Sequence, residues 1–155
     1  MTPALRKVLY LAVCALALTA TACSSNNKGK IEGKWKFVSG PGIDQQAKTL
    51  ESAKAYLFFD FRPDGTVAIG VESSDPAMQK LLVGGTEKTT MSCKYKLLSG
   101  DGVEFYDMPK EMQDGKGGGM FGKNKERART SAKIDGDNMT LTDPDNTRLT
   151  CVRVK

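Results

Sequence analysis

Apolar and polar residues alternate with a period of two along most of this chain, and this alternation limits the fold more than any other feature. In the segment 31–37, for example, Ile31, Trp35 and Phe37 alternate with charged residues. Successive side chains of a β-strand point to opposite faces, so each such segment is typical of a strand with one buried face. The segments with this pattern are 31–37, 57–61, 67–71, 91–97, 103–107, 127–134, 139–142 and 147–155.

Short runs of Gly, Asp, Asn, Pro and Ser separate several of these segments, at 62–65, 99–102, 135–138 and 143–146. Such residues favour tight turns, and tight turns connect antiparallel neighbours. Only 74–84 has helix signals at both ends, and 43–55 is a second candidate helix. The sequence therefore predicts an all-β fold, an antiparallel up-and-down meander of about eight strands with one or two short helices. We expect it to close into a barrel, because closure removes exposed strand edges.

The first 22 residues have the organisation of a secretory signal peptide. Arg6 and Lys7 precede an uncharged apolar run at 8–18, and the segment ends in Ala20, Thr21 and Ala22. A helix that spans a bilayer needs about 20 apolar residues, which is more than this run contains. We expect residues 1–22 to be removed, so that the protein is exported.

The residues around the expected cleavage point resemble the lipobox of bacterial lipoproteins. Ala20, Thr21 and Ala22 precede Cys23, although leucine is more usual at the first of these positions. The resemblance implies that Cys23 carries a diacylglyceryl group and further acyl chains such as palmitate, which suffice for stable membrane anchoring. We therefore expect a membrane anchor in the bacterial cell envelope, on the periplasmic or outer face. An ordinary secreted protein is the alternative.

Composition divides the rest of the chain into two parts. Residues 23–30 contain no apolar residue after Cys23 and are interpreted as a lipidated flexible tether. Residues 31–155 are interpreted as one domain.

Loss of Arg6 and Lys7 with the signal peptide lowers the formal net charge from +5 to +3. This mild positive excess does not indicate a nucleic-acid partner. The sequence gives no indication of the oligomeric state.

Histidine is absent from the whole chain, which excludes Ser-His and Cys-His catalysis and the commonest zinc sites. We expect a protein that is not an enzyme and that needs neither a metal nor a cofactor. After loss of Cys14 with the signal peptide and lipidation of Cys23, the remaining cysteines are Cys93 and Cys151.

Gly33, Lys34 and Trp35 in the first strand resemble the Gly-x-Trp signature of lipocalins, whose tryptophan plugs the closed end of the barrel. Trp35 is either this plug or an ordinary core residue, and the arginine that stacks on it would be Arg148, Arg153 or neither. The Thr-Asp-Tyr loop of lipocalins is missing here. The chain is also similar to small lipocalin-like lipoproteins, including uncharacterised paralogous families of planctomycetes.

The resemblance to lipocalins implies a binding module whose open end holds a small apolar ligand or a lipid. Small inward residues in 127–134, namely Ala128, Thr130 and Ala132, favour an interior with free space. The alternative is a filled barrel that contacts other envelope proteins, which the short domain favours.

Lipocalins often bridge the fourth strand to the C-terminal segment, so the resemblance also implies a disulfide between Cys93 and Cys151. Against this, the fourth and eighth strands lie across an ideal barrel, whereas a disulfide needs Cα atoms within ~7 Å. Two buried free thiols are the alternative.

Four other patterns suggest sites but have simpler explanations. The glycine-rich segment 117–124 imitates a phosphate loop without the preceding strand, and we expect a loose loop over 108–126. Met108, Met112 and Met120 offer thioethers for Cu(I) at irregular spacing. The acidic segments 135–138 and 143–146 lack the calcium-loop pattern and are typical of turns. Glu104 and Asp107 form a carboxylate pair in sequence, but alternation places Glu104 outward.

Overall fold

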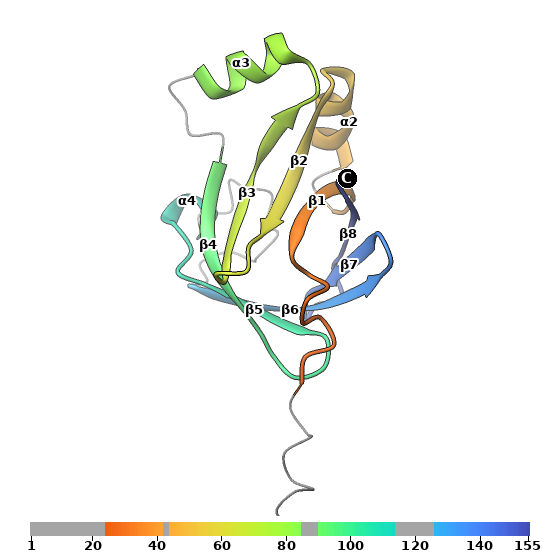
Figure 1. Ribbon diagram of the computed structural model, residues 1–155, viewed down its shortest axis with the longest axis vertical. Coiled ribbons are helices and arrows are strands. Elements are labelled where there is room, and N and C mark those ends of the chain that lie inside the picture. The colour runs from red at the N-terminus through yellow and green to blue at the C-terminus, as the bar shows by residue number, and fades with distance from the viewer. Residues whose placement is uncertain (1–23, 42–43, 85–89, 114–125) are drawn as a thin grey trace, which may run out of the picture.

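The computed structural model describes residues 24–41, 44–84, 90–113 and 126–155, and in these ranges the chain forms a closed antiparallel barrel (Figure 1). The strands follow one another around the barrel in chain order, and β1 pairs with β8 to close it. The predicted all-β up-and-down meander is therefore confirmed. The eight strands are β1 (Gly33–Ser39), β2 (Ala55–Phe61), β3 (Thr66–Ser73), β4 (Thr90–Leu97), β5 (Gly102–Tyr106), β6 (Arg127–Asp135), β7 (Asn138–Thr142) and β8 (Arg148–Arg153).

Two helices, α2 (Asp44–Ser52) and α3 (Pro76–Gly84), lie near one end of the barrel, at the top of Figure 1. Helix α3 begins where the sequence predicts, because the Asp75 carboxylate accepts the backbone N–H groups of Ala77 at 2.9 Å and Met78 at 3.3 Å. A third short helix, α4 (Lys110–Gln113), lies in the segment that was expected to be a loose loop.

Aromatic rings fill the middle of the barrel. The ring centroids of Phe37 and Phe59 are 4.5 Å apart, and those of Phe61 and Tyr95 are 5.1 Å apart in an edge-on arrangement. Phe105 lies 6.4 Å from Phe59 and 6.1 Å from Phe61. All five rings are buried, and burial of each phenylalanine contributes roughly 1.5–3 kcal/mol to stability. The interior at this level is a packed aromatic core.

The segment before β1 is docked against the barrel, which differs from the flexible tether expected over 23–30. Ser25 forms a parallel bridge with Gly100 in the β4–β5 turn, and the Asn26 amide donates to the Asp101 carboxylate at 2.9 Å. The Asn27 amide donates to the carbonyls of Asp101 at 3.2 Å and Ala132 at 2.8 Å. Polar side chains make this segment part of the fold, because backbone acceptors of the barrel are within their reach.

Residues 1–22 and Cys23 lie outside the described residues, as do Met120 and the glycine-rich segment 117–124. In the described ranges, no helix has the length and apolar character needed to cross a membrane.

Candidate functional site

The two residues of the Gly-x-Trp pattern meet an arginine at one end of the barrel. Trp35 is fully buried, and its indole Nε1 donates to the carbonyl of Ile31 at 2.7 Å. The Arg153 guanidinium carbon lies 4.1 Å from the centroid of the Trp35 ring. Gly33 has a φ of +111°, and a Cβ at this position would lie 2.9 Å from Nη1 of Arg153. Gly33 therefore leaves the space in which the arginine reaches the tryptophan.

Cys93 and Cys151 are both free thiols in the structure, so the disulfide implied by the resemblance is not formed there. Cys93 lies in β4 opposite Val67 of β3, and Cys151 lies in β8 between Phe37 and Met139. The two strands are not neighbours in the barrel, as the geometric objection anticipated. Burial raises the pKa of each thiol to about 12, with the Asp107 charge as a second cause for Cys93.

The wall of the barrel opens between β1 and β2. The register between these strands runs from Gly33–Phe61 to Lys36–Phe58 and ends there. Beyond that point the β1–β8 register also shifts, between Phe37 and Ser39. Helix α2, which connects β1 to β2, packs on both strands at this opening.

A pocket of 140 Å³ lies where the two strands part, and we call it the side pocket. Its apolar lining consists of Phe37, Val38, Ala47, Ala55, Leu57 and Val152, and its polar lining of Lys36, Glu51 and Tyr56. The lining thus includes Phe37, which is buried in the core, and Val38, which is 47% exposed. Engineered apolar cavities of about 150 Å³ bind benzene, which sets the size of group that fits.

A network on the outer face positions Tyr56 at the rim of the side pocket. The Tyr56 hydroxyl donates to Glu72 at 2.9 Å, and the Lys34 ammonium lies 2.6 Å from the same carboxylate oxygen. Burial and the bond to Glu72 raise the pKa of Tyr56 to about 12, so this hydroxyl is neutral at physiological pH. The Lys36 ammonium lies 5.6 Å from the centroid of the Tyr56 ring. These contacts hold the rim in place.

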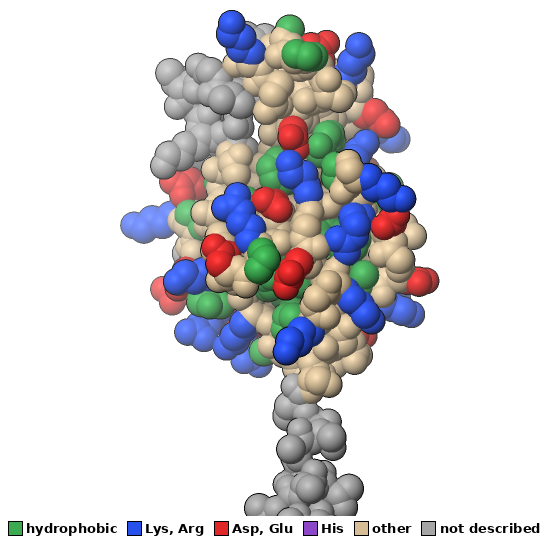
Figure 2. All heavy atoms as spheres, in the orientation of Figure 1, with side chains coloured by type: hydrophobic (Ala, Val, Ile, Leu, Met, Phe, Trp, Pro, Cys, Tyr) green, Lys and Arg blue, Asp and Glu red, His purple; other side chains and the backbone are tan. Residues whose placement is uncertain are grey.

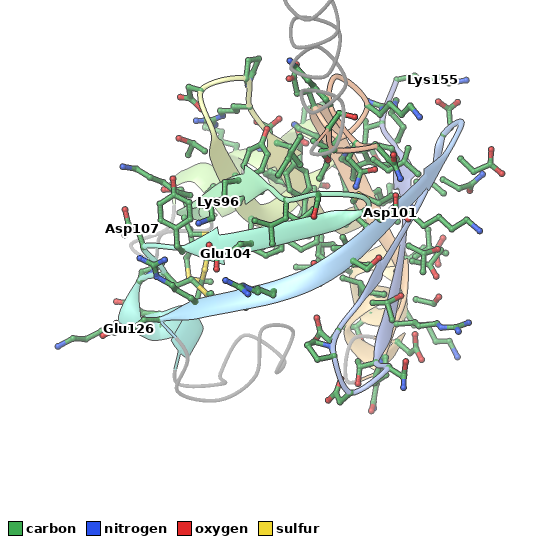
Figure 3. The ribbon with its side chains drawn as sticks, turned by 90° about the horizontal axis from the view of Figure 1, so that it is seen from below. Lys96, Asp101, Glu104, Asp107, Glu126 and Lys155 are labelled. Carbon is green, nitrogen blue, oxygen red and sulfur yellow. The ribbon has the colours of Figure 1, made fainter. Side chains whose placement is uncertain are left out.

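Glu104 forms a second charged cluster, on the outer face of β4, β5 and β6 (Figure 3). Its carboxylate lies 2.5 Å from Lys96, 2.9 Å from Arg129 and 3.9 Å from Arg127. The hydrogen bonds from Lys96 and Arg129 lower the pKa of Glu104 to about 2. The carboxyl group thus stays ionised at neutral pH, which does not suit a general acid.

The remaining candidate residues do not converge. The Asp107 carboxylate lies 3.6 Å from Lys94, at an exposed position, rather than joining Glu104. Met108 and Met112 are buried in the hydrophobic core. Within the described ranges, no group of three or more His, Cys, Asp or Glu residues is arranged to hold a metal ion.

Charged side chains of both signs are interspersed over the face drawn in Figure 2. On this face, therefore, no large single-sign patch of the kind that nucleic-acid-binding proteins use is present.

The side pocket was missed by sequence reasoning. The alternation of apolar and polar residues continues through Phe37 and Leu57, which suggests that β1 and β2 stay paired there, whereas their ladder has already ended. One signal for an interruption at this point was available. The connection at 40–54 is much longer than the tight turn that would suffice to join two neighbouring antiparallel strands. Such a connection carries an element of its own, here α2, and a helix between two strand ends can hold them apart.

The sequence matches no family model, and no curated protein is similar to it. Among solved structures, a lipocalin-like protein from Bacteroides uniformis ATCC 8492 is similar to this chain, at 15% sequence identity and a TM-score of 0.47. The alignment covers 79% of this chain and 97% of that one.

Proposed function

We propose that this chain is an exported lipoprotein, anchored through Cys23, that holds a small apolar group in the side pocket and has no catalytic role. The side pocket is the observation that carries this proposal. Lipocalin ligands are expected in the open end of the barrel, but here aromatic rings occupy the middle of the interior. A lateral opening beside α2 offers the alternative entrance.

The lining of the side pocket indicates the chemistry of its ligand. Lys36 and Glu51 carry opposite charges, and the remaining lining is apolar except for the Tyr56 hydroxyl, which is bonded to Glu72. Such a lining suits a neutral apolar group about the size of a benzene ring or the end of an acyl chain.

Methyl NMR on residues 24–155, which contain the whole barrel, tests the binding site. Benzene and a short-chain alcohol are titrated while the methyl signals of Val38, Ala47 and Leu57 are followed. We expect saturable shifts at these methyls and small changes elsewhere. The Ala47→Leu variant fills the pocket and should abolish the shifts, whereas Ala77→Leu, at an exposed position on α3, should preserve them. Shifts that do not saturate, or that persist in Ala47→Leu, would contradict the proposal.

A separate experiment tests the anchor. Cells that express the full chain are grown with a fatty-acid analogue, and incorporation into the wild type is compared with Cys23→Ser. We expect label in the wild type only. Absence of label in the wild type would show that the protein is not a lipoprotein, whatever the side pocket binds.

The filled interior favours a second candidate function, in which the barrel is a scaffold that contacts other envelope proteins. Ala128, Thr130 and Ala132, whose small side chains favoured free space, are all buried. Failure of every apolar probe to bind, together with co-purification of a defined envelope protein through the exposed rim around Val38, would support the scaffold instead.

A further inference from the structure

The point at which the chain enters the barrel is held by specific contacts. Besides its bridge to Ser25, Gly100 accepts the backbone N–H of Asn26 through its carbonyl at 2.8 Å. Asn27 is only 2% exposed and ties the segment to both the β4–β5 turn and β6. The backbone N–H of Ile31 then donates to the Asn27 carbonyl at 3.1 Å, immediately before β1. The segment from Ser25 onward therefore moves with the barrel.

Very little chain separates this docked segment from the proposed lipid. Only Ser24 lies between Cys23 and Ser25, and consecutive Cα atoms are 3.8 Å apart, so the Cα atoms of Cys23 and Ser25 are at most ~8 Å apart. The segment enters the barrel at the end opposite α2 and α3 (Figure 1). An acyl chain on Cys23 would consequently pull one particular end of the barrel to the bilayer.

We propose that the barrel has a fixed orientation on the membrane, with the β4–β5 turn against the phospholipid head groups and α2 and α3 directed away from them. This inference rests on the proposed lipid anchor. It places the side pocket, which α2 lines, toward the aqueous space and any ligand arriving from it.

Charge in the docked segment fits an anionic head-group surface. Lys28 and Lys30 are exposed in the turn that follows Asn27. Asp101, which follows Gly100, accepts a hydrogen bond from the neutral Asn26 amide and keeps its negative charge, so the two lysines outnumber it. Because the anchor holds these lysines near the bilayer, they lie within reach of its surface potential, which decays over about 8–10 Å at physiological salt.

Site-specific fluorescence on the full-length lipidated protein tests this orientation. The protein is extracted from cells and reconstituted in vesicles of phosphatidylcholine and phosphatidylglycerol. A fluorophore is attached through Ser99→Cys in the β4–β5 turn or, as a matched control, through Ser52→Cys at the end of α2, both of which are exposed positions. Cys93 and Cys151 are buried and do not compete for the label in the folded protein.

Quenching by a lipid that carries a head-group quencher should be several-fold stronger for the Ser99→Cys label than for the Ser52→Cys label. A Gly-Ser insert of about 12 residues after Cys23 extends the reach to ~19 Å and should remove most of this difference. Equal quenching at both sites without the insert, or stronger quenching at Ser52→Cys, would overturn the orientation and leave the anchor intact. Failure of the protein to float with the vesicles would overturn the anchor, and the orientation with it.

Discussion

The guanidinium of Arg153 stacks on the buried ring of Trp35 and also donates hydrogen bonds to the carbonyls of Glu32 at 2.7 Å and Lys30 at 2.6 Å. One side chain from the last strand thus covers the core aromatic of the first strand and fixes the chain just before it. Of the two arginines that sequence analysis left open, Arg153 lies on the tryptophan, and Arg148 is exposed at the other end of β8.

Arg153→Ala should destabilise the barrel by about 2 kcal/mol, since it removes a cation–π contact and two charge-assisted hydrogen bonds. Denaturant melts of residues 24–155 measure the free energy of unfolding. Arg148→Ala is the matched control, and an exposed substitution of this kind should change stability by no more than about 0.5 kcal/mol. Equal effects of the two substitutions would mean that the stacked arginine contributes nothing specific.

Gly33→Ala should be more damaging than an alanine at another glycine with positive φ. At Gly33 the new Cβ meets Arg153 Nη1 at 2.9 Å and the backbone has a φ of +111°, whereas at Gly136, with φ +56°, no atom lies within 4 Å. We expect Gly136→Ala to cost about 1–2 kcal/mol for its left-handed backbone and Gly33→Ala to cost more. In the Arg153→Ala background the steric part of the Gly33→Ala penalty should disappear, which a double-mutant cycle measures.

The two buried thiols should make the barrel sensitive to alkali. Their pKa is about 12 in the folded state, above the ordinary value of 9.0, so the thiols ionise first in the unfolded chain. The stability that the protonated, buried thiols contribute is fully present below pH 9. It is lost as the pH rises from 9 toward 12. At about pH 10.5 the loss is about 2 kcal/mol per thiol.

Denaturant melts of residues 24–155 at neutral and alkaline pH check this dependence. The double variant Cys93→Ala and Cys151→Ala should lose less stability over the same interval, although Tyr56, whose pKa is also raised, still contributes. In native protein at pH 8, neither thiol should react rapidly with a thiol reagent, and both should react after unfolding. Thiols that stay unreactive in unfolded, unreduced protein would show a disulfide.

Glu104→Gln should change the response of the barrel to acid. The folded-state pKa of Glu104 is about 2, below its ordinary value of 4.5. Its ion pairs therefore stabilise the fold above pH 4.5, and this stabilisation is lost as the pH falls from 4.5 toward 2. The melting temperature of Glu104→Gln should therefore lie below that of the wild type at neutral pH and approach it in acid. Glu126→Gln, at an exposed position, is the control. A difference that is independent of pH would mean that Glu104 acts through packing alone.

The barrel could be predicted from the sequence because its determinants are local. Alternation assigns Trp35 and Phe37 to one face without knowledge of the partner strand, and Asp75 before Pro76 starts α3 by a contact within one turn. The antiparallel order follows from the tight turns, because a tight turn places two strands that are consecutive in sequence side by side.

The docked segment and the side pocket could not be predicted from alternation, since alternation encodes neither a contact between distant residues nor the point at which a strand ladder ends. Asn27 is typical of a polar linker in sequence, yet it is buried, with its amide bonded to the carbonyls of Asp101 and Ala132. The β1–β2 ladder ends at Lys36, where α2 packs on both strands, although alternation continues through Phe37. The disulfide inferred for Cys93 and Cys151 came from family resemblance, and the strand order places them apart.

Closure of β1 against β8 also sets the order in which this chain can fold. The hairpins from β2 to β7 pair neighbours in sequence, whereas the Arg153 hydrogen bonds join residues separated by 121 and 123 positions. Contacts of such long sequence separation form slowly, so β1 remains an unpaired edge on one side until β8 is available. A chain that crosses a membrane from its N-terminus would thus deliver Trp35 early and the arginine that stacks on its ring among the last residues.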